Sequence, residues 1–326
     1  MTVTRDRNQR QGFDPPPISV PPLFESPPRP LRMVAWLITK YLWPQTLLWI
    51  AISILAWTFL TPDFGRMDRL EFGWIAQIYL RNVALMLVVI GGLHLWLHVR
   101  RAQGTEFKYD VRWLATNRKS FLFGNQTRDN MFWSLVSGGL IATGYEAFVL
   151  WMYANDHARH TSFDESPVWV IVVTLLVFVI EGFHFYGNHR LLHWEPMYQL
   201  AHSLHHKNVN TGPWSGISMH PLEHVLYFSL PLVFLVIPAS PFVIALCGIY
   251  LMLSPSPSHS GFDRFVLPGG RTLHGGDYFH NLHHRYFECN YGMLLVPIDR
   301  WMGTFHDGSP EAHAVMKERR RAARRV

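Results

Sequence analysis

Four long apolar stretches restrict this chain to a membrane fold. They cover residues 43–60, 76–97, 131–153 and 168–186, and each is close to the roughly 20 residues that a helix needs to cross a bilayer. With 49% hydrophobic and 16% charged residues, the chain is also too apolar for an ordinary soluble protein. A fifth stretch, 225–253, contains IPASP near its middle, where proline favours a break. We therefore expect an all-α integral membrane fold with about four transmembrane helices plus a helical hairpin.

The rest of the chain divides around these stretches. Residues 1–31 carry eight prolines and no apolar period, so we expect a disordered tail. Residues 32–326 are expected to form a single membrane domain. Within it, 33–165 contains the N-terminal spans, 168–305 contains the histidine-rich region, and 306–326 is a basic tail.

The distribution of positive charge orients the spans. Lysine and arginine are concentrated in 99–130, whereas 61–75 is balanced and 154–167 is net acidic. Because cytoplasmic loops carry an excess of positive residues, 99–130 should lie on the cytoplasmic side. The segment 187–224 and both termini should then share that side, and so should all the histidine-rich segments.

Three histidine groups follow the fourth apolar stretch. The sequence HRLLH contains two histidines at positions i and i+4, and both HSLHH and HNLHH contain three at i, i+3 and i+4. Residues at these intervals lie on one face of a helix, an established arrangement for holding a metal. Eight imidazoles exceed the four-coordinate site of one zinc ion, so we expect two metal ions. The candidate ligands are His189, His193, His202, His205, His206, His280, His283 and His284.

Weaker signals lie between and before these groups. His259 is a candidate for a further ligand, and His220 or Glu223 is a candidate to act at the site by orienting a liganding imidazole through its second nitrogen. A capping or turn role is the alternative for His220 and Glu223. The pair His94 and His98 also has helical spacing, but the sequence does not decide between packing and a role at the site. The isolated histidines are expected at helix ends; they are His157, His160, His306 and His313.

The expected chemistry follows from ligand type and location. Neutral imidazole suits iron, zinc, copper and nickel, so the ligands alone do not name the metal. A site at the membrane surface suits a lipid substrate, and unactivated C–H bonds are broken by iron and O₂ at sites with open coordination positions. We therefore expect an O₂-dependent enzyme that uses two iron ions, although imidazole sites bind zinc more tightly and the isolated protein can carry it.

Taken in order, these motifs resemble the fatty acid hydroxylase and sterol desaturase superfamily of membrane di-iron oxygenases. The resemblance covers about 170–305 and includes EGFHFYGNHRLLH, YQLAHSLHH, HPLE, HSG, HNLHHRYFECNYG and DRWMGT. It implies that the eight histidines named above bind two irons and that the chain hydroxylates or desaturates a lipid, of a sterol or fatty-acyl type. His259 matches a further position commonly implicated in the superfamily. Gly182 and Gly187 depart from the tryptophan-containing approach of many relatives, which affects the expected substrate shape but not the metal set.

The chain carries no flavin, haem or iron–sulfur motif. The resemblance therefore implies a separate electron donor of the ferredoxin or cytochrome b5 type with its reductase, besides the membrane lipid, and no nucleic-acid partner. The alternative hypothesis is a histidine-rich membrane metal transporter or sensor. A transporter would place its polar ligands near the bilayer midplane on broken helices, whereas here the histidine groups lie beyond the fourth span.

Overall fold

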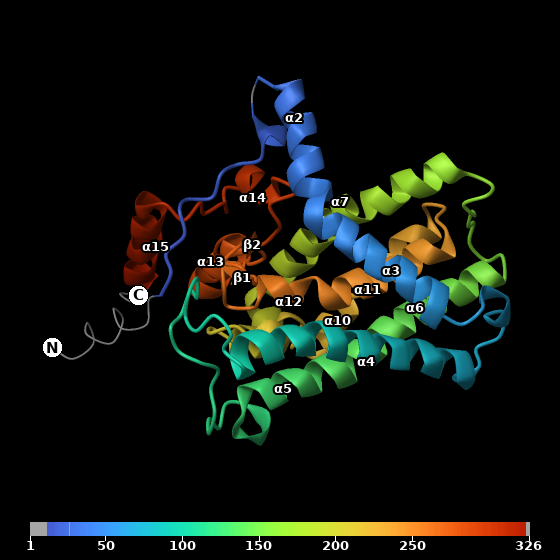
Figure 1. Cartoon of the computed structure of the whole chain (residues 1–326), viewed down its shortest axis with the longest axis horizontal. Coiled ribbons are helices and arrows are strands. Elements are labelled where there is room, and N and C mark those ends of the chain that lie inside the picture. The colour runs from blue at the N-terminus through green and yellow to red at the C-terminus, as the bar shows by residue number, and fades with distance from the viewer. Residues whose placement is uncertain (1–11, 26, 324–326) are drawn as a thin grey trace.

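The computed structural model describes residues 12–25 and 27–323. Long helices run roughly side by side, and the shorter histidine-bearing elements gather at one end of them (Figure 1). In the described part of the chain the only sheet is a small antiparallel hairpin of β1 (Arg264–Val266) and β2 (Thr272–His274). The expectation of an all-α fold is confirmed.

Five described segments are long and apolar enough to cross a membrane, which confirms the expected membrane architecture. These segments are Pro30–Leu60, Phe72–Val99, Gln126–Ala154, Pro167–Leu192 and Pro241–Ser258. Their elements are α2 (Pro30–Trp36), the π-helix η2 (Leu37–Thr46), α3 (Leu47–Leu60), α4 (Phe72–His94), the π-helix η4 (Leu95–Val99), α5 (Gln126–Phe132), the π-helix η6 (Trp133–Gly138), α6 (Gly139–Ala154), α7 (Pro167–Leu192), α11 (Pro241–Leu253) and α12 (Pro255–Ser258).

Shorter elements connect and cover these helices. Those at the histidine-rich end are α8 (Glu195–Met197), the π-helix η7 (Tyr198–His202), α9 (Ser203–His206), η8 (Pro213–Ile217), α10 (Pro221–Tyr227), α13 (Tyr278–Tyr286), α14 (Ile298–Trp301) and α15 (Pro310–Ala323). The remaining 3-10 helices are η1 (Pro22–Phe24), η3 (Phe64–Arg66), η5 (Leu122–Gly124) and η9 (Leu230–Leu235).

Two boundaries differ from the sequence expectation. The first apolar segment begins at Pro30 rather than at residue 43, because α2 and η2 extend it; its helical backbone is interrupted at Trp43 (φ −107°, ψ 137°), just before Pro44. The predicted hairpin over 225–253 has an irregular first arm, since α10 ends at Tyr227 and continues as the 3-10 helix η9. Pro231 lies in that arm, and a proline cannot donate the amide hydrogen bond that an α-helix requires there.

Part of the proline-rich segment expected to form a tail contacts the rest of the protein. Residues 12–25 run along the histidine-rich end of the protein, where the amides of Gly12 and Phe13 donate to the carbonyls of Tyr109 and Lys108. The amide of Ile18 donates to the carbonyl of Asp307. A segment without a core of its own is therefore held by backbone hydrogen bonds to neighbouring loops. Residues 1–11 and residue 26 of the predicted tail lie outside the described residues.

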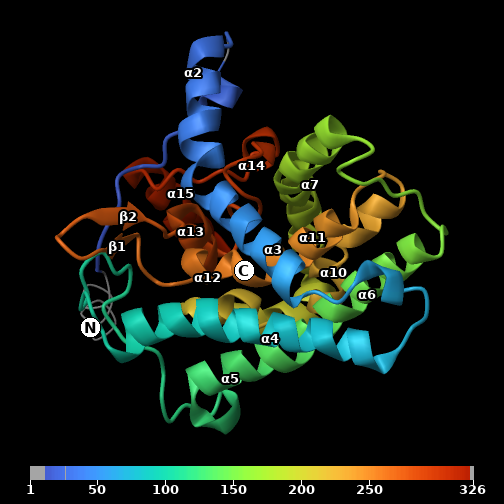
Figure 2. The same ribbon diagram turned by 45° about the vertical axis from the view of Figure 1, so that its right-hand side comes forward.

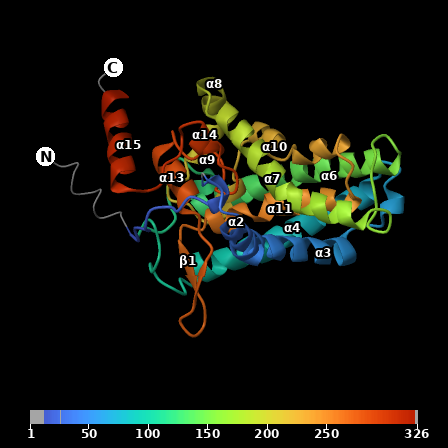
Figure 3. The ribbon, with the colours of Figure 1, turned by 90° about the horizontal axis from the view of Figure 1, so that it is seen from above.

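The core centres on α11, which packs against α3, α4, α6 and α7 (Figures 2 and 3). Every residue of α11 from Val243 to Leu253 is buried. A charged pair is also buried among the spans: Arg81 of α4 donates to Glu146 of α6, and both side chains are at most 1% exposed. Pairing of this kind is what allows charged groups within a bilayer. The pair therefore ties two spans together away from the histidines.

The loops sort to the two ends of the helices. At one end, Asn155 donates to the carbonyl of Asp68, so 61–75 and 154–167 meet there. At the other end, Gln126 donates to the side chain of Asn208, and Lys108 donates to Asn210. The segments 99–130 and 187–224 therefore share the end that carries the histidines.

Candidate metal centre

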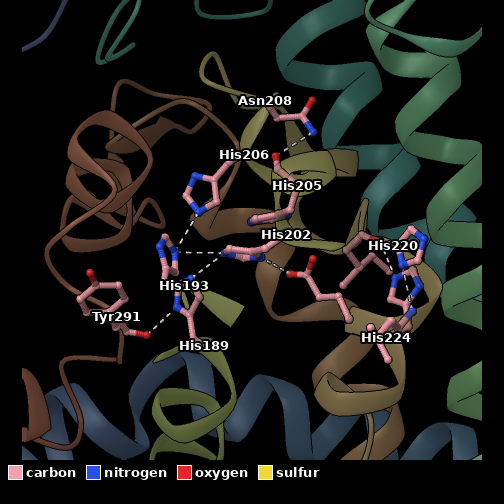
Figure 4. A network of polar contacts seen from close by, with 12 residues as sticks. His189, His193, His202, His205, His206, Asn208, His220, His224 and Tyr291 are labelled. Atoms are coloured by element: carbon pink, nitrogen blue, oxygen red, sulfur yellow. Dashed lines mark hydrogen bonds and ion pairs between the residues drawn. The ribbon is translucent and has the colours of Figure 1, made fainter. Parts of the chain in front are cut away.

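The first histidine pair lies where α7 ends. His189 is on the last turn and His193 is the first residue after Leu192, and both imidazoles project toward the second group (Figure 4). Trp194 has an extended backbone, and Pro196 lies in the first turn of the short helix α8, so the chain turns here. That turn brings the second histidine group back over the first.

The other two groups lie on short helices with clear local signals. His202 closes η7, and α9 carries the two histidines that follow it. In α13, the side chain of Asp277 accepts the amide of His280 at 3.1 Å and so caps the helix. Phe287 then adopts a left-handed conformation (φ 70°) and ends it. All three histidines of HNLHH lie on α13 between this cap and this end.

Nine histidines converge into two groups. In each group, one nitrogen per residue lies within 4.8 Å of every other. We call these the five-histidine group (His189, His193, His202, His206 and His283) and the four-histidine group (His205, His259, His280 and His284). The structure thus brings together His259 and the eight histidines of HRLLH, HSLHH and HNLHH, and it divides them into two sets.

The nitrogens lie as close as ligands of a shared ion would. In the five-histidine group, the Nε2 atoms of His202 and His193 are 3.1 Å apart, and those of His283 and His206 are 3.0 Å apart. In the four-histidine group, the Nε2 atom of His259 is 3.1 Å from Nε2 of both His284 and His280. Two nitrogens at right angles and about 2.0–2.1 Å from one ion are about 3 Å apart. The donor set therefore fits two metal ions.

Second nitrogens fix the orientation of several rings. The Nδ1 atoms of His189 and His283 are 2.6 Å and 2.7 Å from the carbonyl oxygens of Tyr291 and Cys289. A carbonyl only accepts, so each Nδ1 carries the proton and each Nε2 presents its lone pair to the group. The Nδ1 atom of His259 is similarly 3.0 Å from the carbonyl oxygen of Pro255. Such contacts commonly orient metal-bound histidines.

A carboxylate performs the same role for His202. Its Nδ1 is 2.7 Å from Oε1 of Glu223, and both side chains are 2% exposed. Glu223 is on α10, and its other oxygen has no hydrogen-bond partner in the described part of the chain. The structure therefore places Glu223 where the sequence analysis expected an orienting residue.

Burial keeps the imidazoles outside the spans neutral. It lowers the pKa of His193 to about 2, of His205 to about 4 and of His259 to about 3. Burial also lowers the pKa values of the remaining histidines of HSLHH and HNLHH well below the usual 6.5. The pKa of Glu223 is raised by the same desolvation. Neutral rings with free lone pairs are the form that binds metal.

Two supporting residues were not assigned a role from sequence. Asp299 accepts the amides of Tyr291 and Gly292 at 2.9 Å and 2.7 Å, which holds the carbonyl that His189 contacts. Asp299 lies in DRWMGT, so its motif was visible but its role was not. Ring nitrogen Nε2 of His98 lies 2.8 Å from the carbonyl oxygen of Ser260, next to His259.

Other sequence candidates lie outside the two groups. His220 caps α10 by accepting the amide of Leu222 at 3.2 Å, so it takes the alternative capping role and orients none of the nine imidazoles in the described contacts. Likewise, His313 is not a free residue of the tail, because its Nδ1 is 2.7 Å from the hydroxyl of Tyr286. Gly182 is explained by packing: a Cβ there would lie 2.6 Å from the side chain of Val296.

A cavity of about 670 Å³ borders both groups. Histidines from each group line it, together with aromatic residues of α7, α10 and α11 and a number of polar residues. The histidines in its lining are His189, His202, His205, His259 and His280 of the two groups, together with His274. The cavity also reaches residues of η2 and the 15–17 prolines, so the segment before the first span closes part of it.

Comparison with known proteins identifies the region that carries these histidines. A family model described as fatty acid hydroxylase matches residues 174–304. The histidine-rich region is therefore similar to the fatty acid hydroxylase family. This region holds all nine histidines, together with Glu223 and Asp299, and the resemblance seen in the sequence is confirmed.

Several curated proteins are similar to the chain. A Delta(7)-sterol 5(6)-desaturase of Gibberella zeae is 27% identical over 252 residues, which cover 72% of each chain. A very-long-chain aldehyde decarbonylase of Oryza sativa subsp. indica is 32% identical over 149 residues, or 43% of this chain and 55% of the relative. A methylsterol monooxygenase of Aspergillus fumigatus is 30% identical over 167 residues, or 46% and 50%. No solved structure gives a significant match.

The family match and these relatives indicate an oxidoreductase embedded in a membrane. The alignments with the decarbonylase and the monooxygenase span only about half of those proteins.

Proposed function

We propose that this protein is a di-iron oxygenase that hydroxylates or desaturates an aliphatic C–H bond of a membrane lipid, of a sterol or fatty-acyl type. The observation that carries the proposal is that two histidine groups border one cavity, which also has aromatic residues in its wall. The family match and the desaturase and monooxygenase names of its relatives support the same reaction class.

The five-histidine and four-histidine groups would each hold one iron. Bound iron would supply the activation of O₂ that amino-acid side chains cannot provide. The chain contributes neutral nitrogen donors, whose positions are fixed by the contacts of His189, His202, His259 and His283 through Nδ1. Glu223 stabilises the proton on Nδ1 of His202, which keeps Nε2 of that ring free as a ligand.

The cavity would hold the lipid with its reacting carbon beside the histidines. Phe178 and Phe185 of α7 and Tyr227 of α10 give part of its wall an aromatic surface that suits a lipid chain. The wall also includes Trp36 and Trp49 of the first apolar segment, so a lipid in the bilayer has a short route to the cavity. We therefore propose entry from the membrane rather than from the aqueous phase.

The donor of electrons would dock at the histidine-rich end. We propose that this end and both termini are cytoplasmic, because 99–130 is strongly basic and lies there. The partner would be a ferredoxin or a cytochrome b5 type protein with its reductase. Single cysteines in place of the exposed residues Arg66 and Arg159 should then react with an impermeant label from outside, and cysteines in place of the exposed residues Arg101 and Lys119 should not; the reverse pattern would contradict this orientation.

A metal transporter or sensor is the alternative, and the site geometry does not favour it. The nine histidines lie at the ends of the spans rather than at mid-depth on broken helices. Glu146, which is buried between the spans, forms a salt bridge with Arg81. The described polar groups thus do not form a ligand path along the helices.

The decisive test compares lipids after expression with and without the protein. Cells that express it should accumulate an oxidised lipid only when O₂ is present. The purified, iron-loaded protein with a reduced ferredoxin should consume O₂ in step with product. Product formation under strict anaerobiosis would contradict the proposal, as would turnover by protein freed of metal.

A further inference from the structure

A carboxyl group inside the cavity is left without a partner. Glu181 lies on α7, is 4% exposed and lines the cavity. Within the described residues, no salt bridge or hydrogen bond reaches it, and its Oε2 atom is buried and unpaired. Burying a carboxyl in this way costs free energy unless something supplies a hydrogen bond. The cavity itself is the space from which that partner can come.

Two tyrosine hydroxyls that line the cavity donate their hydrogen bonds to backbone carbonyls and not to Glu181. The hydroxyl of Tyr227 donates to the carbonyl of Leu251 at 3.0 Å. The hydroxyl of Tyr41 donates to the carbonyl of Leu175 at 2.6 Å. Both tyrosines line the same cavity as Glu181, yet neither hydroxyl serves its carboxyl group. The protein thus surrounds an acceptor with apolar rings and leaves it available.

The position of Glu181 sets a distance to the site. One face of α7 lines the cavity, through Phe178, Glu181, Phe185 and His189. The eight residues from Glu181 to His189 correspond to about 12 Å along a helix. A ligand on this face can therefore contact the carboxyl and the histidine groups at once, if its polar group is several carbon–carbon bonds from the reacting carbon.

We propose that Glu181 is a subsite that hydrogen-bonds the hydroxyl of the lipid, so that the substrate is a neutral lipid alcohol oxidised at a carbon remote from its hydroxyl. This inference rests on the proposed function. A hydroxyl supplies the donor that the carboxyl lacks, whereas a fatty-acid carboxylate has no proton to donate. A site built to bind a buried hydroxyl also rejects analogues without one.

An anionic lipid is the competing occupant. Lys40 is exposed and lines the same cavity from η2, where it could bind a carboxylate headgroup. In that case Glu181 would have no part in recognition. The two readings differ in which lipid binds and in what the loss of the Glu181 carboxyl does.

Equilibrium binding to the zinc-loaded full chain in nanodiscs tests the proposal without turnover. The probes are hexadecanol and cholesterol, the O-methyl ether of each, and palmitate. The unmodified protein should bind at least one alcohol at least about tenfold more tightly than its ether, the scale of one buried hydrogen bond. Glu181→Leu should remove this preference, and Glu181→Gln should retain it, since the amide carbonyl still accepts a hydroxyl. Glu71→Leu, at an exposed carboxyl on the opposite end, is the matched control.

Stability separates recognition from a structural role. Removing an unpaired buried carboxyl should leave the melting temperature of Glu181→Leu equal to or above that of the unmodified protein, with unchanged zinc content. The proposal is overturned if Glu181→Leu keeps the preference for alcohols, or if palmitate binds more tightly than either alcohol. Because binding is measured without O₂ or donor, failure of this inference is distinct from failure of the oxygenase reaction.

Discussion

The two histidine groups draw on the same helices but divide their residues in opposite ways. In HSLHH, the i and i+4 residues, His202 and His206, enter the five-histidine group, and the i+3 residue enters the four-histidine group. In HNLHH, His280 and His284 enter the four-histidine group, and His283 enters the other. On a helix, i and i+4 are about 40° apart, whereas i+3 lies about 60° to the other side of i. A helix between two sites can therefore supply both.

The groups also differ in support. The five-histidine group has three rings held through Nδ1, by Tyr291, Cys289 and Glu223. In the four-histidine group, Nδ1 of His259 lies beside the hydroxyl of Ser258 and the carbonyl of Pro255, and His205 has a backbone hydrogen bond with Ser218. All four of its members are buried, whereas His193 of the larger group is half-buried. The four-histidine group thus has fewer ligands to spare, and more rings of the five-histidine group are oriented by contacts through Nδ1.

The largest expected effect is the loss of a ligand from the smaller group. His259→Ala leaves three imidazoles there, so we expect it to lose about one metal ion per chain and all lipid oxidation. His193→Ala leaves four in the larger group, so it should retain more metal while oxidation still fails. Metal content by mass spectrometry and O₂-dependent turnover measure both.

The control is His157→Ala, at an exposed position on the opposite end of the helices. His313 is unsuitable because it contacts Tyr286. Equal metal loss in His259→Ala and His193→Ala would show that the two groups tolerate the loss of one ligand equally.

Acid should release the metal of the smaller group first. Burial lowers the pKa of His205 to about 4, but that of His193 to about 2. Both pKa values lie below the usual 6.5, so the neutral binding form persists into mild acid and is lost only as the pH approaches the shifted values. Stepwise dialysis from pH 7 downward should show one metal leaving per chain at a higher pH than the other. His259→Ala protein should lack that first step, and its presence there would refute the order.

An intermediate effect is expected from the anchor of the larger group. Glu223→Gln keeps the shape but replaces the carboxyl oxygen beside Nδ1 of His202 with an amide group, which is a weaker acceptor. Loss of such a contact typically lowers metal affinity or activity by about 10–100-fold. Competition with a chelator and the kcat for lipid oxidation measure the change. Unaltered values would show that the carboxylate does not support the ring.

The smallest effect is expected from the anchor of the smaller group. Ser258 lies 3.0 Å from Nδ1 of His259, but the carbonyl oxygen of Pro255 is at the same distance. Ser258→Ala should therefore change metal affinity by less than about threefold, because one acceptor remains. The same chelator titration applies. An effect as large as that of Glu223→Gln would mean that the groups are supported alike.

The sequence by itself determined the membrane class, the approximate positions of most spans, and eight of the ligand candidates with a ninth at His259. These follow from local rules, since apolar length fixes a span and helical spacing fixes which histidines share a face. The breaks at Trp43 and in η9 were harder to predict from the sequence, because a helix interrupted by proline continues or ends according to the segments that pack against it.

Only the tertiary structure decided the partition of the nine histidines and the residues that support them. The contact of His202 with Glu223 joins positions 21 residues apart, and that of His189 with the Tyr291 carbonyl joins positions 102 apart. The role of Asp299 depends on the path of the loop that it holds. The unpaired state of Glu181 is also a property of its surroundings. Spacing along a chain specifies a face of a helix, but which faces meet is set by the packing of segments that are far apart in sequence.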